Sequence, residues 1–153
     1  MSETARIADQ LRRAFEGEAW HGPAVLEILS DVDGATAAAR PLDQAHSIWE
    51  LVLHIAAWDE AVRRRMKGEA LTLSLEQNFP HAHETSEDAW RKAVDELKNA
   101  HAELIRAVEA VPDSRLTEQV PGKDYDFYFM LHGAVQHELY HAGQIILLKK
   151  VAG

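Results

Sequence analysis

The hydrophobic positions of the chain follow a helical period in four long segments. Apolar side chains recur three or four residues apart, and because a helix turns about 100° per residue, this spacing gathers them on one face. In the first segment, residues 4–18, the spacing is seen at Ile7, Leu11 and Phe15. The sequence Trp-His-Gly-Pro at residues 20–23 ends this helix, and its proline suits the first turn of a further helical piece.

The second long segment, residues 47–67, has a strong start signal. Ser47 and Glu50 form a capping box, in which each side chain accepts a hydrogen bond from an otherwise unpaired backbone N–H. The basic residues 63–65 favour the negative helix C-terminus, and Gly68 can end the helix. We interpret the basic run as a solvated helix end rather than an anion site. The apolar stripe of this segment consists of Ile48, Leu51, Val52, Ile55, Val62 and Met66.

The third and fourth long segments begin near Ser86 and near Asp126. The third has the most regular apolar spacing in the chain, and His101 fills the one remaining place in that series. The fourth continues to Val151, with two lysines in its last turn. The apolar series of the third segment is Trp90, Val94, Leu97, Leu104 and Val108.

Four long helices without a convincing strand predict an all-α fold, a four-helix bundle forming one domain over residues 1–153. The connections at residues 31–43, 68–85 and 111–125 are all longer than about 12 residues, which is long for a compact domain. Connections of this length can cross an end of the bundle or cover it. Simple up-down-up-down order is therefore not required.

The charge and residue content exclude several classes of function. With 16 basic and 25 acidic side chains, the net charge of −9 disfavours nucleic acid or an anionic membrane as the main partner. Cysteine is absent, which excludes disulfides, thiolate metal sites and a cysteine nucleophile. The N-terminus lacks a signal sequence, so we expect a cytoplasmic location. Four tryptophans and amphipathic helices are compatible with a homodimer.

The chemistry of the chain centres on the sequence His-Glu-Leu-Tyr-His at residues 137–141. Two histidines four apart lie on one helix face and can bind the same metal ion. The spacing matches the zinc-protease pattern, but no histidine, acid or cysteine follows it to supply a third ligand. An ordinary zinc protease is therefore disfavoured, and a third ligand has to come from earlier in the chain. Without one, these would be two half-exposed histidines at a helix edge.

His54, at the edge of the apolar stripe in residues 47–67, is the best upstream candidate for the third ligand. His101 is also a candidate, although a histidine in an apolar stripe is more often a hydrogen-bonded core residue. His21 and His46 can line the mouth of a cleft, and spacing alone does not place them.

Two further polar residues accompany the histidine pair. Glu138 lies about 100° around the helix from His137, near the inward arc, which is the side of this helix that faces the bundle interior and carries both histidines. It is a candidate general base for a water or a thiol. A solvated glutamate is the equal alternative. Gln144 is a candidate hydrogen-bond partner that fixes a ligand ring or the substrate.

Three stretches together resemble the DinB/YfiT-like superfamily: residues 20–23, residues 46–54, and residues 137–145 with their His-x-x-x-His-x-Gly-Gln pattern. The resemblance covers almost the whole chain. It implies an up-down-down-up four-helix bundle and a divalent metal, commonly zinc or nickel, bound by three histidines. By position these are His54, His137 and His141.

Relatives in this superfamily include thiol-dependent S-transferases, a mycothiol-dependent isomerase and suspected hydrolases. The resemblance thus implies a metal-dependent hydrolase, or a transferase using a low-molecular-weight thiol as co-substrate, acting on a small molecule. The alternatives are a non-catalytic metal-binding or stress-response protein with a structural ion, and a helical interaction module without metal.

Overall fold

The computed structural model describes residues 1–153 and is helical throughout, with a single isolated β-bridge between Gln119 and Asp126. The all-α prediction is confirmed. None of the helices combines the length and the apolar character needed to cross a bilayer. The helices are α1 (Glu3–Phe15), α2 (Val25–Leu29), α3 (Gly34–Ala38), α4 (Ile48–Met66), α5 (Leu75–Asn78), α6 (Glu87–Ala110), the 3₁₀ helix η1 (Asp113–Thr117) and α7 (Phe127–Ala152).

Each of the four long helices begins next to a capping residue. Ser2, Ser47, Ser86 and Asp126 each accept a hydrogen bond from a backbone N–H in the first turn of α1, α4, α6 and α7. At Ser47 the full capping box is present. The three long connections contain the short helices α3, α5 and η1, which the apolar spacing did not predict because none is longer than five residues.

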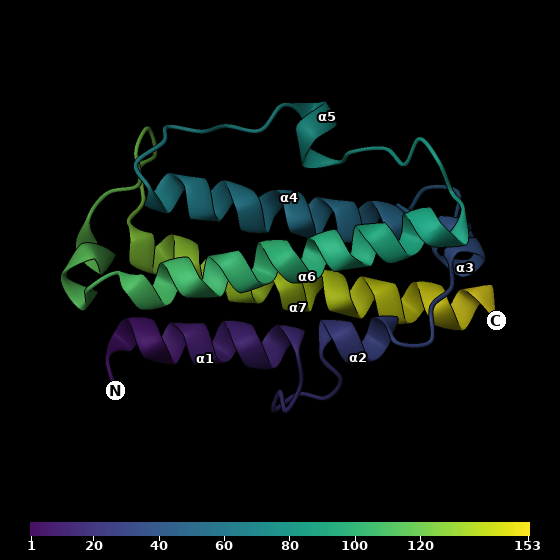
Figure 1. Cartoon of the computed structure of the whole chain (residues 1–153), viewed down its shortest axis with the longest axis horizontal. Helices are drawn as coiled ribbons and strands as arrows, with labels where there is room; N and C mark the ends of the chain where they lie inside the picture. Colours follow the sequence, from purple (N-terminus) through teal and green to yellow (C-terminus); the bar gives the residue numbers. More distant parts are fainter.

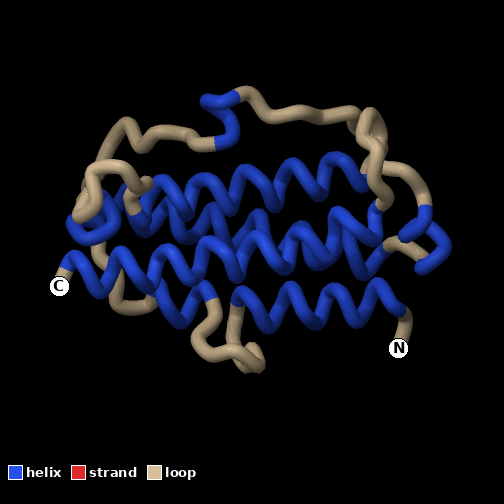
Figure 2. The backbone as a smooth tube through the Cα atoms, turned by 180° about the vertical axis from the view of Figure 1, so that it is seen from behind, coloured by secondary structure: helices blue, strands red, loops and turns tan.

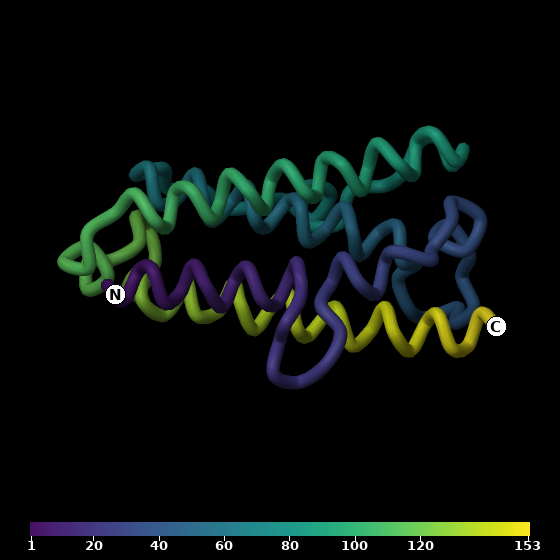
Figure 3. The backbone as a smooth tube through the Cα atoms, turned by 60° about the horizontal axis from the view of Figure 1, so that its bottom comes forward, coloured from purple at the N-terminus to yellow at the C-terminus, as the bar shows by residue number.

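The long helices lie roughly parallel to one axis, with α1 and α2 end to end along one side (Figure 1). α1 and α7 run in one direction, whereas α4 and α6 run in the other, as the colours in Figures 1 and 3 show. α4 and α1 each pack against both α6 and α7. Because α4 and α7 pack against each other, the cavity between them is lined by residues far apart in the sequence.

The connection from α4 to α6 returns along the outside of the bundle and carries α5 (Figure 2). Its hydrogen bonds to α4 include those from Trp58 Nε1 to Asn78 Oδ1 at 2.7 Å and from Arg65 Nε to the Leu71 carbonyl at 3.0 Å. This segment therefore covers the outer side of α4, as its length allowed.

Buried polar side chains divide the hydrophobic core into two clusters. One cluster draws on the start of α4 and the end of α7, and the other on the end of α4 and the start of α7. On each of α4, α6 and α7, buried polar residues lie between the stretches that supply the two clusters. These residues are Asp59 on α4, His101 on α6, and Glu138 and His141 on α7, and the buried His54 lies within the first stretch of α4.

Candidate metal centre

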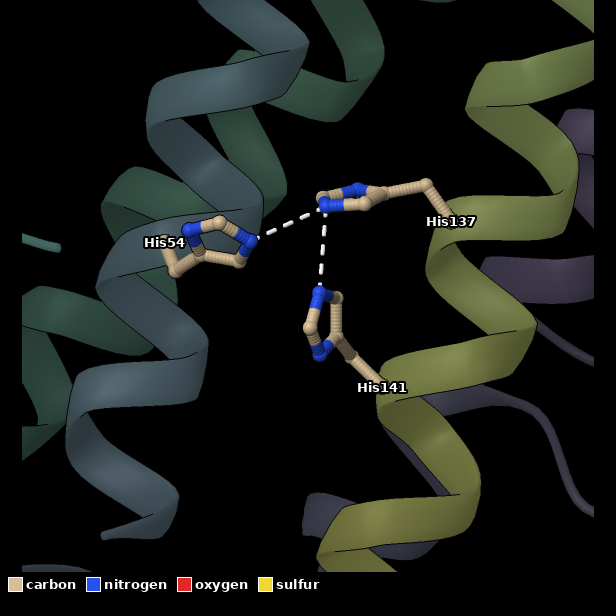
Figure 4. A group of neighbouring side chains, drawn as sticks. All are labelled: His54, His137 and His141. Carbon is tan, nitrogen blue, oxygen red and sulfur yellow. Dashed lines mark hydrogen bonds between the residues drawn. The ribbon is translucent and has the colours of Figure 1, made fainter. Parts of the chain in front are cut away.

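Three histidine rings from α4 and α7 meet in the middle of the bundle. His137 Nε2 lies 3.0 Å from His54 Nε2 and 3.1 Å from His141 Nε2 (Figure 4). His54 and His141 are buried and His137 is half-buried. The four-residue step on α7 supplies two of the rings from one helix face, and the packing of α4 against α7 brings the third.

Hydrogen bonds at the opposite ring nitrogens fix the orientation of two of these rings. His54 Nδ1 donates to the Asn78 carbonyl at 2.6 Å, and His141 Nδ1 donates to Gln144 Oε1 at 2.6 Å. A neutral imidazole that carries its proton on Nδ1 has a lone pair on Nε2. The lone pairs of His54 and His141 therefore both face His137.

The pKa values of these three rings are lowered, so the rings are neutral at pH 7. Burial lowers the pKa of His54 to about 4, against the hydrogen bond to Asn78. Burial and then the charges of the two neighbouring histidines lower the pKa of His137 to about 3. Burial also lowers the pKa of His141, although Gln144 opposes it.

The donor set fits a divalent transition metal. Metal ligands have to be deprotonated, and these rings are neutral with two Nε2 lone pairs already presented. Nitrogens bound tetrahedrally to zinc at 2.0–2.1 Å would lie about 3.3–3.4 Å apart, close to the separations found here. The hydrogen bonds at Nδ1 are of the kind that orient metal-bound histidines.

A cavity of about 490 Å³ opens beside the three rings, between α4 and α7. Trp58, Asp59, Val62 and Arg65 line it from α4, and Asn78 and Phe79 from the connection that covers α4. The α7 side consists of Phe129, Met130, Gly133, Ala134 and Tyr140 with the two histidines, and Tyr125 also lines the cavity. A small apolar molecule with few polar groups suits such a cavity.

A second polar cluster is formed by Asp59, His101 and Glu138. His101 Nδ1 lies 2.7 Å from Glu138 Oε1 and 3.2 Å from Asp59 Oδ2, and all three side chains are at least 97% buried. His101 Nε2 donates to the Leu11 carbonyl at 3.2 Å. The donors converge closely enough to be a possible metal site. His101 Nδ1, however, forms its hydrogen bond with Asp59 and a 2.7 Å ion-pair contact with Glu138, and we interpret the cluster as an ion-paired one.

Burial and neighbouring charges shift all three pKa values in this cluster. Burial alone would lower the pKa of His101, but the hydrogen bonds and charges of Asp59 and Glu138 raise it to about 10. Burial, followed by the charge of Asp59, raises the pKa of Glu138 to about 8, and burial raises that of Asp59. The imidazolium form of His101 thus compensates carboxylate charge inside the bundle.

The structure places Glu138, the candidate base, away from the cavity. Its side chain is fully buried and directed at His101, and it does not line the cavity. A molecule in the cavity meets Asp59 instead. The rotation of 100° from His137 carries Glu138 past the α4 side towards His101 on α6.

The remaining candidate residues are placed separately. Gln144, the candidate hydrogen-bond partner of a ligand ring or the substrate, bonds to His141. His46 stacks on Phe79 and lies 3.3 Å from Glu50, and His21 lies near the loop after α1; neither lines the cavity.

Residues of the covering connection were missed by the sequence analysis. Phe79 stacks on His54 with ring centroids 3.9 Å apart, and the Asn78 carbonyl orients the same ring. A backbone acceptor has no residue preference, so only the extreme length of that connection signalled a role.

Comparison with known protein families identifies the superfamily of the chain. A family model described as the DinB superfamily matches residues 19–145, which include all three histidines. No curated protein and no solved structure matches the chain significantly. The model spans most of the sequence, and the chain belongs to the DinB superfamily.

Proposed function

We propose that the protein is a metal-dependent enzyme in which His54, His137 and His141 bind one divalent transition metal, zinc or nickel. The proposed reaction is hydrolysis, or transfer of a low-molecular-weight thiol, on a small molecule. The observation that carries the proposal is the convergence of three Nε2 atoms at the wall of a 490 Å³ cavity. Three protein ligands leave room for a further ligand from the cavity.

A divalent ion at this position would lower the pKa of a water or thiol and polarise an electrophile. The protein residues have separate tasks. Asn78 and Gln144 hold the rings of His54 and His141 in the binding tautomer. Asp59 is the carboxyl group that lines the cavity and can hold a proton there, with His101 and Glu138 behind it. Trp58 and the apolar side chains of α7 exclude bulk water.

A structural ion is the second candidate, and one observation favours it. The three histidines join α4 to α7, and the His54 ring also anchors the covering connection through Asn78 and Phe79. An ion there would fasten three parts of the fold. A fourth protein ligand would close the coordination and support this alternative, whereas a ligand from the cavity supports the enzyme.

Metal-dependent turnover tests the proposed function. Protein purified without a polyhistidine tag is assayed on activated esters, amides and epoxides, each with and without small thiols. We expect activity on one class, its loss on chelation and its return with zinc or nickel. The control is His83→Ala, which changes an exposed loop histidine outside the cavity and should leave activity unchanged. Turnover that survives complete metal removal would contradict the proposal.

Acid release of the metal should occur at an unusually low pH. An unperturbed histidine has a pKa of about 6.5, but burial lowers the values of His54 and His137 to about 4 and about 3. Because these values are lowered, protonation competes with metal only as the pH falls towards them. We expect retention through about pH 5.5 and release near about pH 4, measured by dialysis and elemental analysis.

The same pKa shifts predict how the stability of the metal-free protein depends on pH. Below about pH 6.5 the unfolded chain binds more protons at these histidines than the folded chain, so stability falls as the pH decreases towards the folded pKa values. Circular dichroism at each pH distinguishes metal release from unfolding of the protein. Metal release from folded protein near pH 6.5 would contradict the expected release near about pH 4.

A further inference from the structure

The cavity beside the histidines contains a buried cation at its other end. The Arg65 side chain is 97% buried and lines the cavity, although residues 63–65 were interpreted as a solvated helix end. Arg63 and Arg64 fit that interpretation, since they pair with Glu60 and Glu69 near the surface. For Arg65 the interpretation is wrong, and no carboxylate lies within 4.0 Å of its guanidinium group.

We propose that Arg65 and Tyr125 bind the carboxylate of a small organic acid whose apolar body lies along Trp58 and whose reactive end faces His54, His137 and His141. The assignment of the reactive end rests on the proposed function. The carboxylate position rests on Arg65 and its surroundings alone.

The hydrogen bonds of Arg65 leave some of its guanidinium N–H donors without an acceptor. Nε donates to the Leu71 carbonyl at 3.0 Å and Nη1 donates to the Tyr125 hydroxyl at 3.2 Å. A guanidinium group has five N–H donors, so three have no protein partner. Because the Tyr125 oxygen accepts from Arg65, its own O–H is available to another acceptor. Two adjacent groups thus offer donors in the shape that a carboxylate accepts.

Charge balance also favours an anion at this position. Taking a cation out of water costs several kcal/mol unless an opposite charge or other contacts compensate it. The Trp58 ring, 5.3 Å from the guanidinium carbon, supplies cation–π stabilisation but no negative charge. The nearest acid in the cavity wall, Asp59, is already paired with His101. A bound carboxylate would provide the missing charge.

The arrangement of the cavity sets the size of the molecule. His54, Trp58, Val62 and Arg65 follow steps of four, four and three residues, so they share one face of α4. The Trp58 ring lies 6.0 Å from the His137 ring and 5.3 Å from the Arg65 guanidinium carbon. One indole ring thus separates the two ends. An aryl or short alkyl chain with a terminal carboxylate has the matching length.

Calorimetric titration with 3-phenylpropanoate and its neutral amide tests the proposal. The pair differs in the group that Arg65 would bind. Each is titrated into metal-loaded protein and into chelated protein, because in the latter no metal can bind the carboxylate. We expect the acid to bind about tenfold more tightly than the amide in both forms, as a charge-assisted hydrogen bond predicts. Equal binding of acid and amide would overturn the proposal.

Three variants locate the preference. In Arg65→Gln the acid should lose its advantage, whereas Arg64→Gln, which removes a neighbouring surface charge, should keep it. Tyr125→Phe keeps the ring and should lower the preference about threefold, which tests the position even if Arg65→Gln does not fold. An unchanged preference in Tyr125→Phe, or in folded Arg65→Gln, would overturn the assignment.

Two further results separate the alternatives. Inorganic phosphate should bind more weakly than 3-phenylpropanoate, and equal affinity would overturn the role of the apolar body. Metal content is measured in the same samples by elemental analysis. If no metal binds but the preference for the acid is intact, the proposed function is contradicted and the carboxylate site is retained. If metal binds but the acid is not preferred over the amide, the carboxylate site is contradicted and the proposed function is retained.

Discussion

Replacing His54 with alanine is expected to weaken zinc or nickel binding by about 100-fold or more. His54 supplies one of three converging nitrogens and the only one from α4. Even a residue that merely orients a ligand is worth about 10–100-fold in metal affinity, and a ligand should be worth at least that. The two remaining histidines lie on one helix and would bind the ion as an isolated pair. Competition with a chromophoric chelator measures the affinity.

His46→Ala is the matched control for this variant. His46 and His54 both stack on Phe79, with ring centroids 3.8 and 3.9 Å away. His46 does not reach the group of three nitrogens, however. Its replacement should therefore leave affinity within about twofold of the unchanged protein, which isolates coordination from stacking. Unchanged affinity in His54→Ala would exclude it as a ligand and direct the search to another helix.

The fold could be predicted from sequence where periodicity and capping act together. Ser47 with Glu50, and Asp126 before an inward arc, give signals within one helix, so α4 and α7 were found to within a few residues. The short α3 has no such pattern. Asp33 caps it, and its first residue donates to the Glu87 side chain at 2.6 Å, a contact across 53 positions. A helix stabilised by distant contacts leaves little trace in its own sequence.

The site could be predicted in part for the same reason. His137 and His141 follow from a four-residue step. His54 was the best of several upstream candidates by its place on the helix, and the resemblance to a family singled it out as the third ligand. Glu138 shows where rotation about one helix fails, since it gives a direction without saying which neighbour lies there. Arg65 shows the same limit. The basic run predicted a helix end correctly, but which of three arginines faces the cavity depends on how α4 packs against α7.

The buried cluster behind the cavity leads to the second large prediction, which concerns stability. His101 connects all four long helices: Nε2 bonds to the Leu11 carbonyl on α1, and Nδ1 faces Asp59 on α4 and Glu138 on α7. Its ring also stacks on Phe15, with centroids 3.9 Å apart. Removing it leaves two buried carboxylates without their cation.

We expect His101→Ala to lower the free energy of unfolding by about 3–5 kcal/mol, the usual cost of removing one partner of a buried ion pair. This is a large share of the roughly 5–15 kcal/mol by which domains are stable. Metal stoichiometry should not change, because His101 is not part of the three-histidine group. Urea unfolding measures the first quantity and elemental analysis the second.

The pH dependence and a charge-removing control distinguish lost charge from lost packing. The pKa of His101 is raised to about 10, so its contribution is complete below the unfolded value of about 6.5 and disappears as the pH rises through 10. The difference in unfolding free energy between the unchanged protein and His101→Ala should therefore narrow as the pH rises from about 6.5 to about 10. Adding Asp59→Asn and Glu138→Gln to His101→Ala removes the uncompensated charges and should recover part of the loss. If the difference in unfolding free energy does not depend on pH, and Asp59→Asn and Glu138→Gln only increase it, His101 contributes packing and not charge. Loss of metal in His101→Ala with unchanged stability would instead make His101 a ligand.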